Sequence, residues 1–187
     1  MWCDRALNAA LGVCGAALLG VALSVAAAEG EPTALELRVK AAFVYKFAEY
    51  VEWPAGAFAQ PDAPLTIGVM GADALADELR DVTAGRRVDG HPVAVRVVKA
   101  GESLSGLQVL FIGRTETMRL AQWIKLASPS ALIVSESDGA LDAGSVINLV
   151  MRQGRVRFEV SLGAADKRGL KLSSRMLAVA LQVRSLD

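Results

Sequence analysis

Apolar positions recur with the period of an α-helix along residues 33–50. Every fourth position from Leu35 is apolar, namely Leu35, Val39, Phe43 and Phe47, and Val51 just after the stretch continues the series. This spacing places the side chains on one face of a helix, which indicates packing against a core. Pro32 and Thr33 suit the start of the helix, because a proline in the first turn costs no hydrogen bond. Pro54 disfavours helical backbone at Trp53 and predicts its end.

Short apolar runs rich in β-branched residues follow and predict buried strands. They occupy residues 65–69, 93–98, 109–112, 131–134, 146–150 and 156–160. Helical periodicity separates the first run from the second, after Gly71, and the third from the fourth, from Thr115. Two further helices are expected, over residues 161–168 and from Ser173 or Ser174 onward. The last helix is expected to bury Met176, Leu177, Ala180 and Leu181.

Strands that alternate with helices predict a single α/β domain. We expect a central, mostly parallel sheet formed by the first four runs, with helices on both faces. The last two runs flank Gly154, which can adopt the positive φ of a tight turn. They therefore predict a C-terminal antiparallel hairpin, which we place at one edge of the sheet.

The first thirty residues have the pattern of an export signal. Arg5 precedes an apolar stretch over residues 6–25, and the alanines at 26–28 offer a small-residue cleavage site. We expect residues 1–28 to be a signal peptide cleaved near Ala28. Residues 29–187, about 160 in number, would form one ordinary domain. A retained membrane anchor is the alternative, because a spanning helix needs roughly 20 apolar residues.

Composition excludes several classes of site. The 187 residues include 20 Lys and Arg and 20 Asp and Glu, so the formal net charge is zero and no basic field indicates nucleic acid. Cys3 and Cys14 both lie in the predicted signal, so the mature domain should hold no disulfide or thiolate metal site. His91, the single histidine, lies in a predicted turn, and no G-x-S-x-G motif accompanies it. We expect no cofactor and no metal.

Two loops could hold small ligands. Gly71 and Ser135 follow predicted parallel strands, at whose carboxyl ends open α/β sheets bind ligands. The sequence therefore keeps open a small-ligand receptor with a crevice at these residues. Glu136, Asp138 and Asp142 form an acidic loop, but their spacing does not match a calcium-binding loop, which favours a solvated loop.

Basic residues gather on the predicted hairpin and just after it. Arg152, Arg155 and Arg157 lie on the hairpin, and Lys167, Arg168 and Lys171 follow. The group suits an acidic ligand or partner surface, but charges on an edge strand also prevent unwanted pairing, so both interpretations stay open. Aromatic residues near the end of the first helix similarly fit either core packing or an interface: Tyr45, Tyr50, Trp53 and Phe58.

Residues 39–54 read V-K-A-A-F-V-Y-K-F-A-E-Y-V-E-W-P and resemble the opening signature of the YfiR family. The resemblance continues at residues 67–71, 109–113, 147–150, 156–160 and 169–177. It implies a periplasmic α/β regulator without enzymatic activity. Such a regulator binds the periplasmic part of an inner-membrane diguanylate cyclase and holds it inactive. An outer-membrane-linked lipoprotein sequesters the regulator under envelope stress, so that cyclic di-GMP and biofilm formation rise.

The sequence departs from the family at two places. Leu107 and Gln108 stand where family members often have Cys-His, so the redox control known in the family is not expected. Ser161 stands where an asparagine is usual.

We therefore predict a periplasmic repressor that acts by binding a diguanylate cyclase or the periplasmic domain of a sensor kinase. The candidate partner-binding residues are Arg155, Arg157, Glu159, Arg168 and Lys171. A homodimer would pair through the edge hairpin. The alternative is the small-ligand receptor module for a membrane sensor, with its crevice at Gly71 and Ser135.

Overall fold

The main element of the fold is an eight-stranded sheet. The computed structural model describes residues 32–185, so the predicted signal peptide and its cleavage site lie outside the described residues. In chain order the strands of this sheet are β2 (Leu65–Met70), β3 (Arg87–Val88), β4 (His91–Val97), β5 (Val109–Ile112), β6 (Leu132–Ser135), β7 (Ile147–Arg152), β8 (Arg155–Ser161) and β10 (Gln182–Arg184).

The centre of the sheet is parallel, as the sequence predicts. The strand order is β10-β8-β7-β6-β5-β2-β4-β3, and β4, β2, β5, β6 and β7 pair in parallel. β8 returns antiparallel to β7, and β10 then runs parallel to β8. A second, small antiparallel sheet joins β1 (Val51–Glu52) to β9 (Lys171–Leu172).

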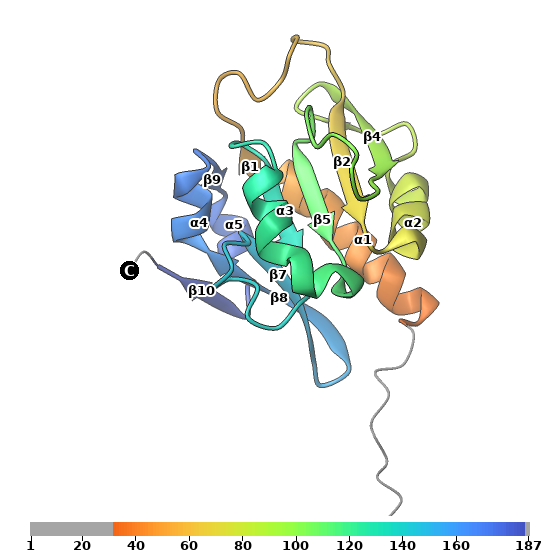
Figure 1. Cartoon of the computed structure of the whole chain (residues 1–187), viewed down its shortest axis with the longest axis vertical. Coiled ribbons are helices and arrows are strands. Elements are labelled where there is room, and N and C mark those ends of the chain that lie inside the picture. The colour runs from red at the N-terminus through yellow and green to blue at the C-terminus, as the bar shows by residue number, and fades with distance from the viewer. Residues whose placement is uncertain (1–31, 186–187) are drawn as a thin grey trace, which may run out of the picture. The chain divides into compact units, whose positions relative to one another are not determined.

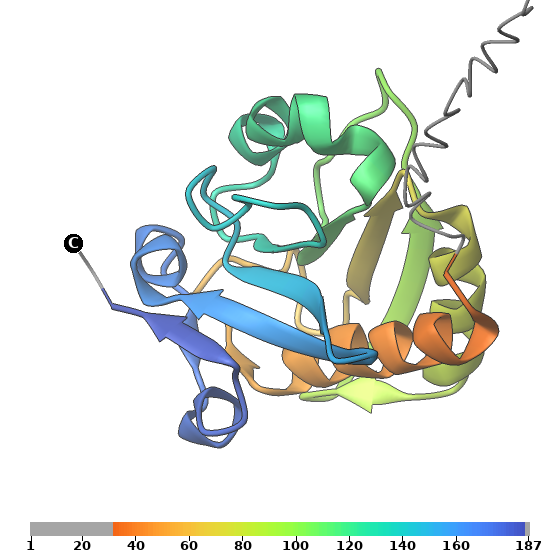
Figure 2. The same ribbon diagram turned by 90° about the horizontal axis from the view of Figure 1, so that it is seen from below.

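Helices cover both faces of the sheet (Figures 1 and 2). They are α1 (Ala34–Glu49), α2 (Asp73–Thr83), the 3-10 helix η1 (Arg114–Arg119), α3 (Leu120–Leu126), α4 (Leu162–Lys167) and α5 (Ser174–Leu177). In Figure 2, α1 and α2 lie below the sheet and α3 lies above it. None of the helices within residues 32–185 combines the length and the hydropathy needed to cross a bilayer.

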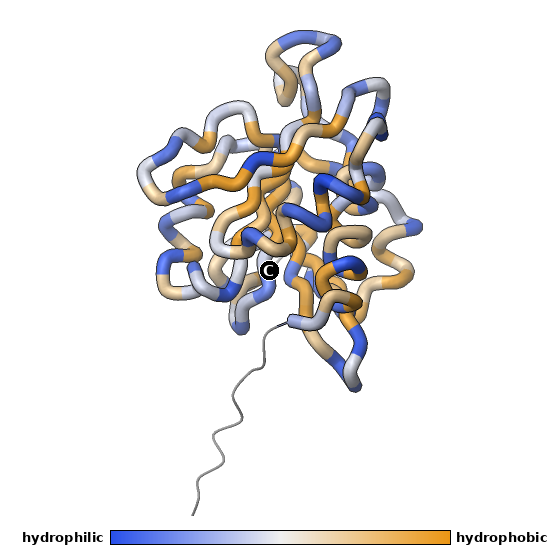
Figure 3. The backbone as a smooth tube through the Cα atoms, turned by 90° about the vertical axis from the view of Figure 1, so that its right-hand side faces the viewer, coloured by the Kyte–Doolittle hydropathy of each residue, from blue (hydrophilic) through white to orange (hydrophobic). Residues whose placement is uncertain are grey.

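Alternating side chains of the strands divide the core in two. Val109 and Phe111 of β5 belong to the cluster that includes α1 and α2. Leu110 and Ile112 point the other way, into a cluster with Trp123 of α3. Figure 3 shows the resulting pattern, with apolar segments along the central strands and hydrophilic segments mainly at the turns around them.

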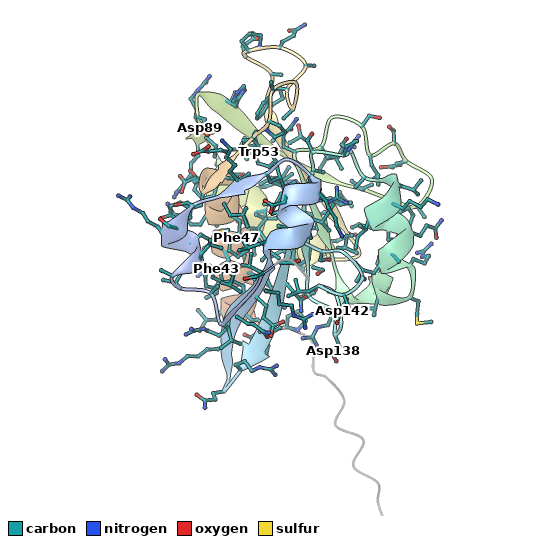
Figure 4. The ribbon with its side chains drawn as sticks, turned by 90° about the vertical axis from the view of Figure 1, so that its left-hand side faces the viewer. Phe43, Phe47, Trp53, Asp89, Asp138 and Asp142 are labelled. Carbon is teal, nitrogen blue, oxygen red and sulfur yellow. The ribbon has the colours of Figure 1, made fainter. Side chains whose placement is uncertain are left out.

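The predicted first helix is confirmed as α1. The hydroxyl of Thr33 accepts a hydrogen bond from the amide of Glu36 at 3.2 Å, which caps the helix. Two turns of α1 carry Phe43 and Phe47, labelled in Figure 4, whose ring centroids lie 5.5 and 4.9 Å from that of Phe158 on β8. The aromatic triad joins the first helix to the hairpin, far apart in the sequence.

The fold class and the hairpin are confirmed, but the last segment of the chain differs from the prediction. The final helix, α5, ends at Leu177, and the chain then forms β10 along β8. Leu181, predicted to be buried in this helix, lies beyond its end and is 42% exposed, and its amide donates to Phe158 O at 2.8 Å. The hairpin is therefore not the outermost pair, and β10 covers the edge at which we expected self-association.

His91 also differs from the prediction. It begins β4 instead of lying in a surface turn. Its ring stacks on Phe58 at a centroid distance of 3.8 Å, and Nδ1 lies 2.7 Å from the carbonyl oxygen of Ala63. Phe58 in turn makes an edge contact with Trp53, so this part of the aromatic group packs within the fold. The single histidine holds the loop before β2 against the sheet.

Replacing Phe158 with alanine should remove the ring that both α1 phenylalanines contact. Phe158 is 2% exposed, and truncating a buried phenylalanine lowers the free energy of unfolding by about 3–5 kcal/mol. Val183→Ala, on the exposed strand β10, should change it by less than about 1 kcal/mol. Urea unfolding followed by circular dichroism measures both, and equal losses would contradict the proposed core.

Candidate partner-binding site

The hairpin presents different side chains on its two faces. Val156, Phe158 and Val160 are buried and belong to the cluster under α1. Because successive residues of a strand point in opposite directions, Arg157 and Glu159 lie on the other face. Arg155, next to the turn, is exposed. By the same alternation, the three β8 residues predicted to bind a partner share one face of the strand, and Arg155 is the one nearest the turn.

An apolar groove separates the first turns of α1 from the tip of the hairpin. It has a volume of about 460 Å³, and its lining includes Leu35, Val39, Phe43, Met151, Val156 and Arg155. Figure 2 shows the hairpin running alongside α1. Leu35 is 71% exposed although it continues the apolar stripe of the helix. The stripe therefore extends beyond the core into the groove.

Charge at the groove is unevenly compensated. Glu36 lines it but is paired with Lys40 at 2.6 Å. Arg155 makes no ion pair with any residue in the part of the chain that the structure describes. An exposed guanidinium beside an apolar floor suits a partner that presents an apolar side chain near a carboxylate.

Lys40 anchors α1 from its buried side. Only 5% of this residue is exposed, and its Nζ lies 2.6 Å from carboxylate oxygens of both Glu36 and Glu136. Glu136 also accepts a long hydrogen bond, 3.4 Å, from the amide of Arg114. The ion pairs fix the groove-lining half of α1 to the loop after β6.

The acidic loop of Glu136, Asp138 and Asp142 was predicted to be solvated, and this holds for only part of it. The prediction is wrong for Glu136, whose side chain is 11% exposed because it compensates Lys40. Asp138 and Asp142, labelled in Figure 4, are exposed on the same loop. Asp142 pairs with Arg184 of β10 at 2.5 Å. No group of three potential metal-ligating side chains occurs within residues 32–185.

The two residues of the expected ligand crevice lie in tightly packed surroundings. At Gly71, φ is +67°, and its carbonyl accepts a hydrogen bond from the Thr115 hydroxyl at 2.9 Å. A Cβ on Gly113 would lie 2.4 Å from the same carbonyl oxygen, so the chains after β2 and β5 touch. Ser135 is fully buried and donates to Asn148 Oδ1 at 3.1 Å. Neither Gly71 nor Ser135 lines the groove.

Arg168 and Lys171 lie away from the groove. The half-buried Arg168 guanidinium donates to three main-chain carbonyls at the end of α3 and beyond, those of Ile124, Ser128 and Ala131, at 3.1, 3.0 and 3.4 Å. Burial lowers the pKa of Arg168. Lys171 pairs weakly with Glu52, at 3.9 Å, on the small sheet. Of the five predicted partner-binding residues, Arg155 alone lines the groove.

Sequence reasoning missed Leu35 and Lys40 as site residues. Leu35 carried a signal, since it opens the apolar stripe, but the stripe was interpreted wholly as core. Lys40 stands inside the same helix without any local feature that predicts burial. Its partner Glu136 is 96 residues away in the sequence, so only the fold reveals the pair.

Replacing Lys40 with alanine should strongly destabilise the domain. It leaves two poorly exposed carboxylates without their shared cation, and breaking a buried pair in this way costs about 3–5 kcal/mol. Lys46→Ala is the matched control on the same helix, because Lys46 pairs with Glu49 but its side chain is 52% exposed. An exposed pair contributes less than about 1 kcal/mol. Urea unfolding measures both variants. Equal losses in the free energy of unfolding would contradict the structural role assigned to the buried Lys40 ion pairs.

Two solved structures match this chain at low sequence identity. A conserved domain protein from Vibrio cholerae O1 biovar El Tor matches with a TM-score of 0.54 and 12% identity, over 79% of this chain and 60% of that one. This chain thus spans about three fifths of the length of the Vibrio protein. An ABC domain in complex with L-Trp from Streptococcus pneumonia has a TM-score of 0.49 and 13% identity, over 64% and 55% of the two chains.

Comparison with curated protein sequences found no match. A family model described as YfiR/HmsC-like matches residues 37–181. The matched range begins in α1 and ends just before β10, so it includes the hairpin and the five central strands that pair in parallel. The chain therefore belongs to the YfiR/HmsC-like family.

Proposed function

We propose that this chain is a periplasmic negative regulator that binds the periplasmic part of an inner-membrane signalling protein. The target class we favour is a diguanylate cyclase, so that binding lowers cyclic di-GMP and restrains biofilm formation. Membership of the YfiR/HmsC-like family supports the regulatory role. The export pattern of the first 28 residues supports the compartment.

The single observation that carries the proposal is the apolar groove between α1 and the hairpin. Leu35, which is 71% exposed, lies at the mouth of the groove and belongs to its contiguous apolar lining. Val39 and Phe43 continue the apolar lining inward. A partner side chain inserted here would displace water from apolar surface on both sides, which favours association.

Arg155 gives the groove a charged rim. Rim charges contribute more to the rate and orientation of encounter than to final affinity. An acidic residue next to the inserting apolar side chain of the partner would meet Arg155. Arg157, two residues along the same strand, does not line the groove and is not part of this contact.

Repression by binding requires a preference between states of the target. The regulator must bind the inactive conformation of the membrane protein more tightly than the active one. Each tenfold shift of that equilibrium needs about 1.4 kcal/mol of differential binding free energy. A sequestering lipoprotein of the outer membrane would relieve repression by occupying the same groove, because one site cannot hold both partners.

The test is the cyclic di-GMP level of a strain that lacks the gene. Deletion should raise cyclic di-GMP, and wild-type protein exported to the periplasm should restore it. Unchanged cyclic di-GMP after deletion would contradict a cyclase as the target. Recovery of a sensor kinase in a periplasmic pull-down would then identify the other class of membrane partner.

Leu35→Glu should abolish repression without unfolding the domain. A carboxylate at the mouth of the groove must be desolvated for the partner to dock, so affinity should fall by about tenfold or more. Met118→Glu is the matched control, because Met118 is 96% exposed on η1, outside the groove. Cyclic di-GMP and pull-down yield measure both variants, with periplasmic protein levels checked by immunoblot. Equal behaviour would reject the groove.

Arg155→Ala should slow association with the partner several-fold at low salt, and the difference should shrink as salt is added. Arg157→Ala serves as control on the same strand, because Arg157 is also exposed but does not line the groove. Surface plasmon resonance over a series of NaCl concentrations measures the association rates. If Arg157→Ala slowed association as much as Arg155→Ala, a contact specific to the rim of the groove would be rejected.

A further inference from the structure

A second concavity lies at the other end of β8. It has a volume of about 640 Å³ and is bounded by the end of α3, the loop before β7, the start of α4 and the end of β10. Its lining shares no residue with that of the groove. This basic pocket is defined by Lys125, Lys167, Arg168 and Arg184, with apolar walls that include Ile124 and Leu141.

Positive charge is concentrated in the basic pocket. Four cationic side chains line it, against the single carboxylate of Asp142, in a chain whose formal net charge is zero. Such a concentration in a concave site raises the local concentration of anions.

Two of the four cations are already engaged by the protein. Arg168 donates to three carbonyls, and Arg184 pairs with Asp142. The ammonium groups of Lys125 and Lys167 make no ion pair or hydrogen bond within residues 32–185. Two positive charges therefore remain available to a ligand.

The helix dipole explains the position of these two lysines, but it does not explain the rest of the pocket. Lys125 and Lys167 lie in the last turns of α3 and α4, where a cation interacts favourably with the helix dipole. That interaction explains the charges but not the apolar wall of the pocket. Ile124, Leu141 and Ala164 form this wall, and they would contact a hydrocarbon or aromatic group.

We propose that the basic pocket binds a small organic phosphate, with the phosphate between Lys125 and Lys167 and an apolar body against the wall. A phosphate monoester carries close to two negative charges near neutral pH, which matches the two available ammonium groups. The pocket is separate from the groove, so this inference does not rest on the proposed repression of a membrane partner.

The experiment titrates the purified mature protein with phenyl phosphate by isothermal calorimetry. Saturable binding is expected, and it should weaken as NaCl is raised. The double variant Lys125→Gln/Lys167→Gln should bind about tenfold more weakly or worse, the equivalent of about 1.4 kcal/mol. Lys99→Gln, an exposed lysine outside the pocket, should bind like wild type. Circular dichroism verifies that each variant is folded.

Two further ligands separate the contributions of charge and apolar body. Inorganic phosphate should bind more weakly than phenyl phosphate, and phenol should not bind measurably. The absence of saturable phenyl phosphate binding, or equal binding by the double variant, would overturn the proposal. Equal affinity for inorganic phosphate would overturn the role of the apolar wall. Leu35→Glu should retain phenyl phosphate binding, which distinguishes failure of the pocket from failure of the groove.

Discussion

The packing of α1 against the hairpin is the interaction on which the remaining structure depends. Phe43 and Phe47 meet Phe158 at the centre of this contact, and edge-to-face aromatic pairs add directional preference to the burial of apolar area. The contact fixes the angle at which the first turns of α1 leave the sheet. The groove is the space that this angle leaves beside the hairpin tip, so its shape follows from core packing.

The Lys40 ion pairs make the same position of α1 more specific. A buried ion pair contributes little net stability compared with apolar residues of similar size, because both charges lose their hydration. It does penalise any alternative packing that separates the charges. If α1 rotated or slid along the sheet, Lys40 would leave Glu136 while both remained poorly hydrated. The pair therefore opposes repacking of the helix segment that lines the groove.

Local patterns predicted the elements whose side chains repeat regularly, and they failed where tertiary pairing decides the structure. The stripe from Leu35 to Phe47 was sufficient to predict α1, and the turn at Gly154 was sufficient to predict the hairpin. β10 was missed because its three residues show no periodicity and become a strand only by pairing with β8. Within the candidate site, Arg155 was predicted from local charge, whereas the engagement of Arg168 with three carbonyls depends on where α3 ends.

The close contact after β2 and β5 explains why both candidate binding surfaces are peripheral. Open α/β sheets commonly bind ligands where the strand order reverses, which here is the junction of Gly71 and Gly113. Thr115 and Glu116 of η1 occupy the space over Gly71, so that position is filled by the chain itself. The groove and the basic pocket instead lie at opposite ends of β8, where α1, α4 and β10 complete their walls. Both candidate binding surfaces are therefore formed by the elements packed around the hairpin, because η1 fills the space at the carboxyl ends of the central parallel strands.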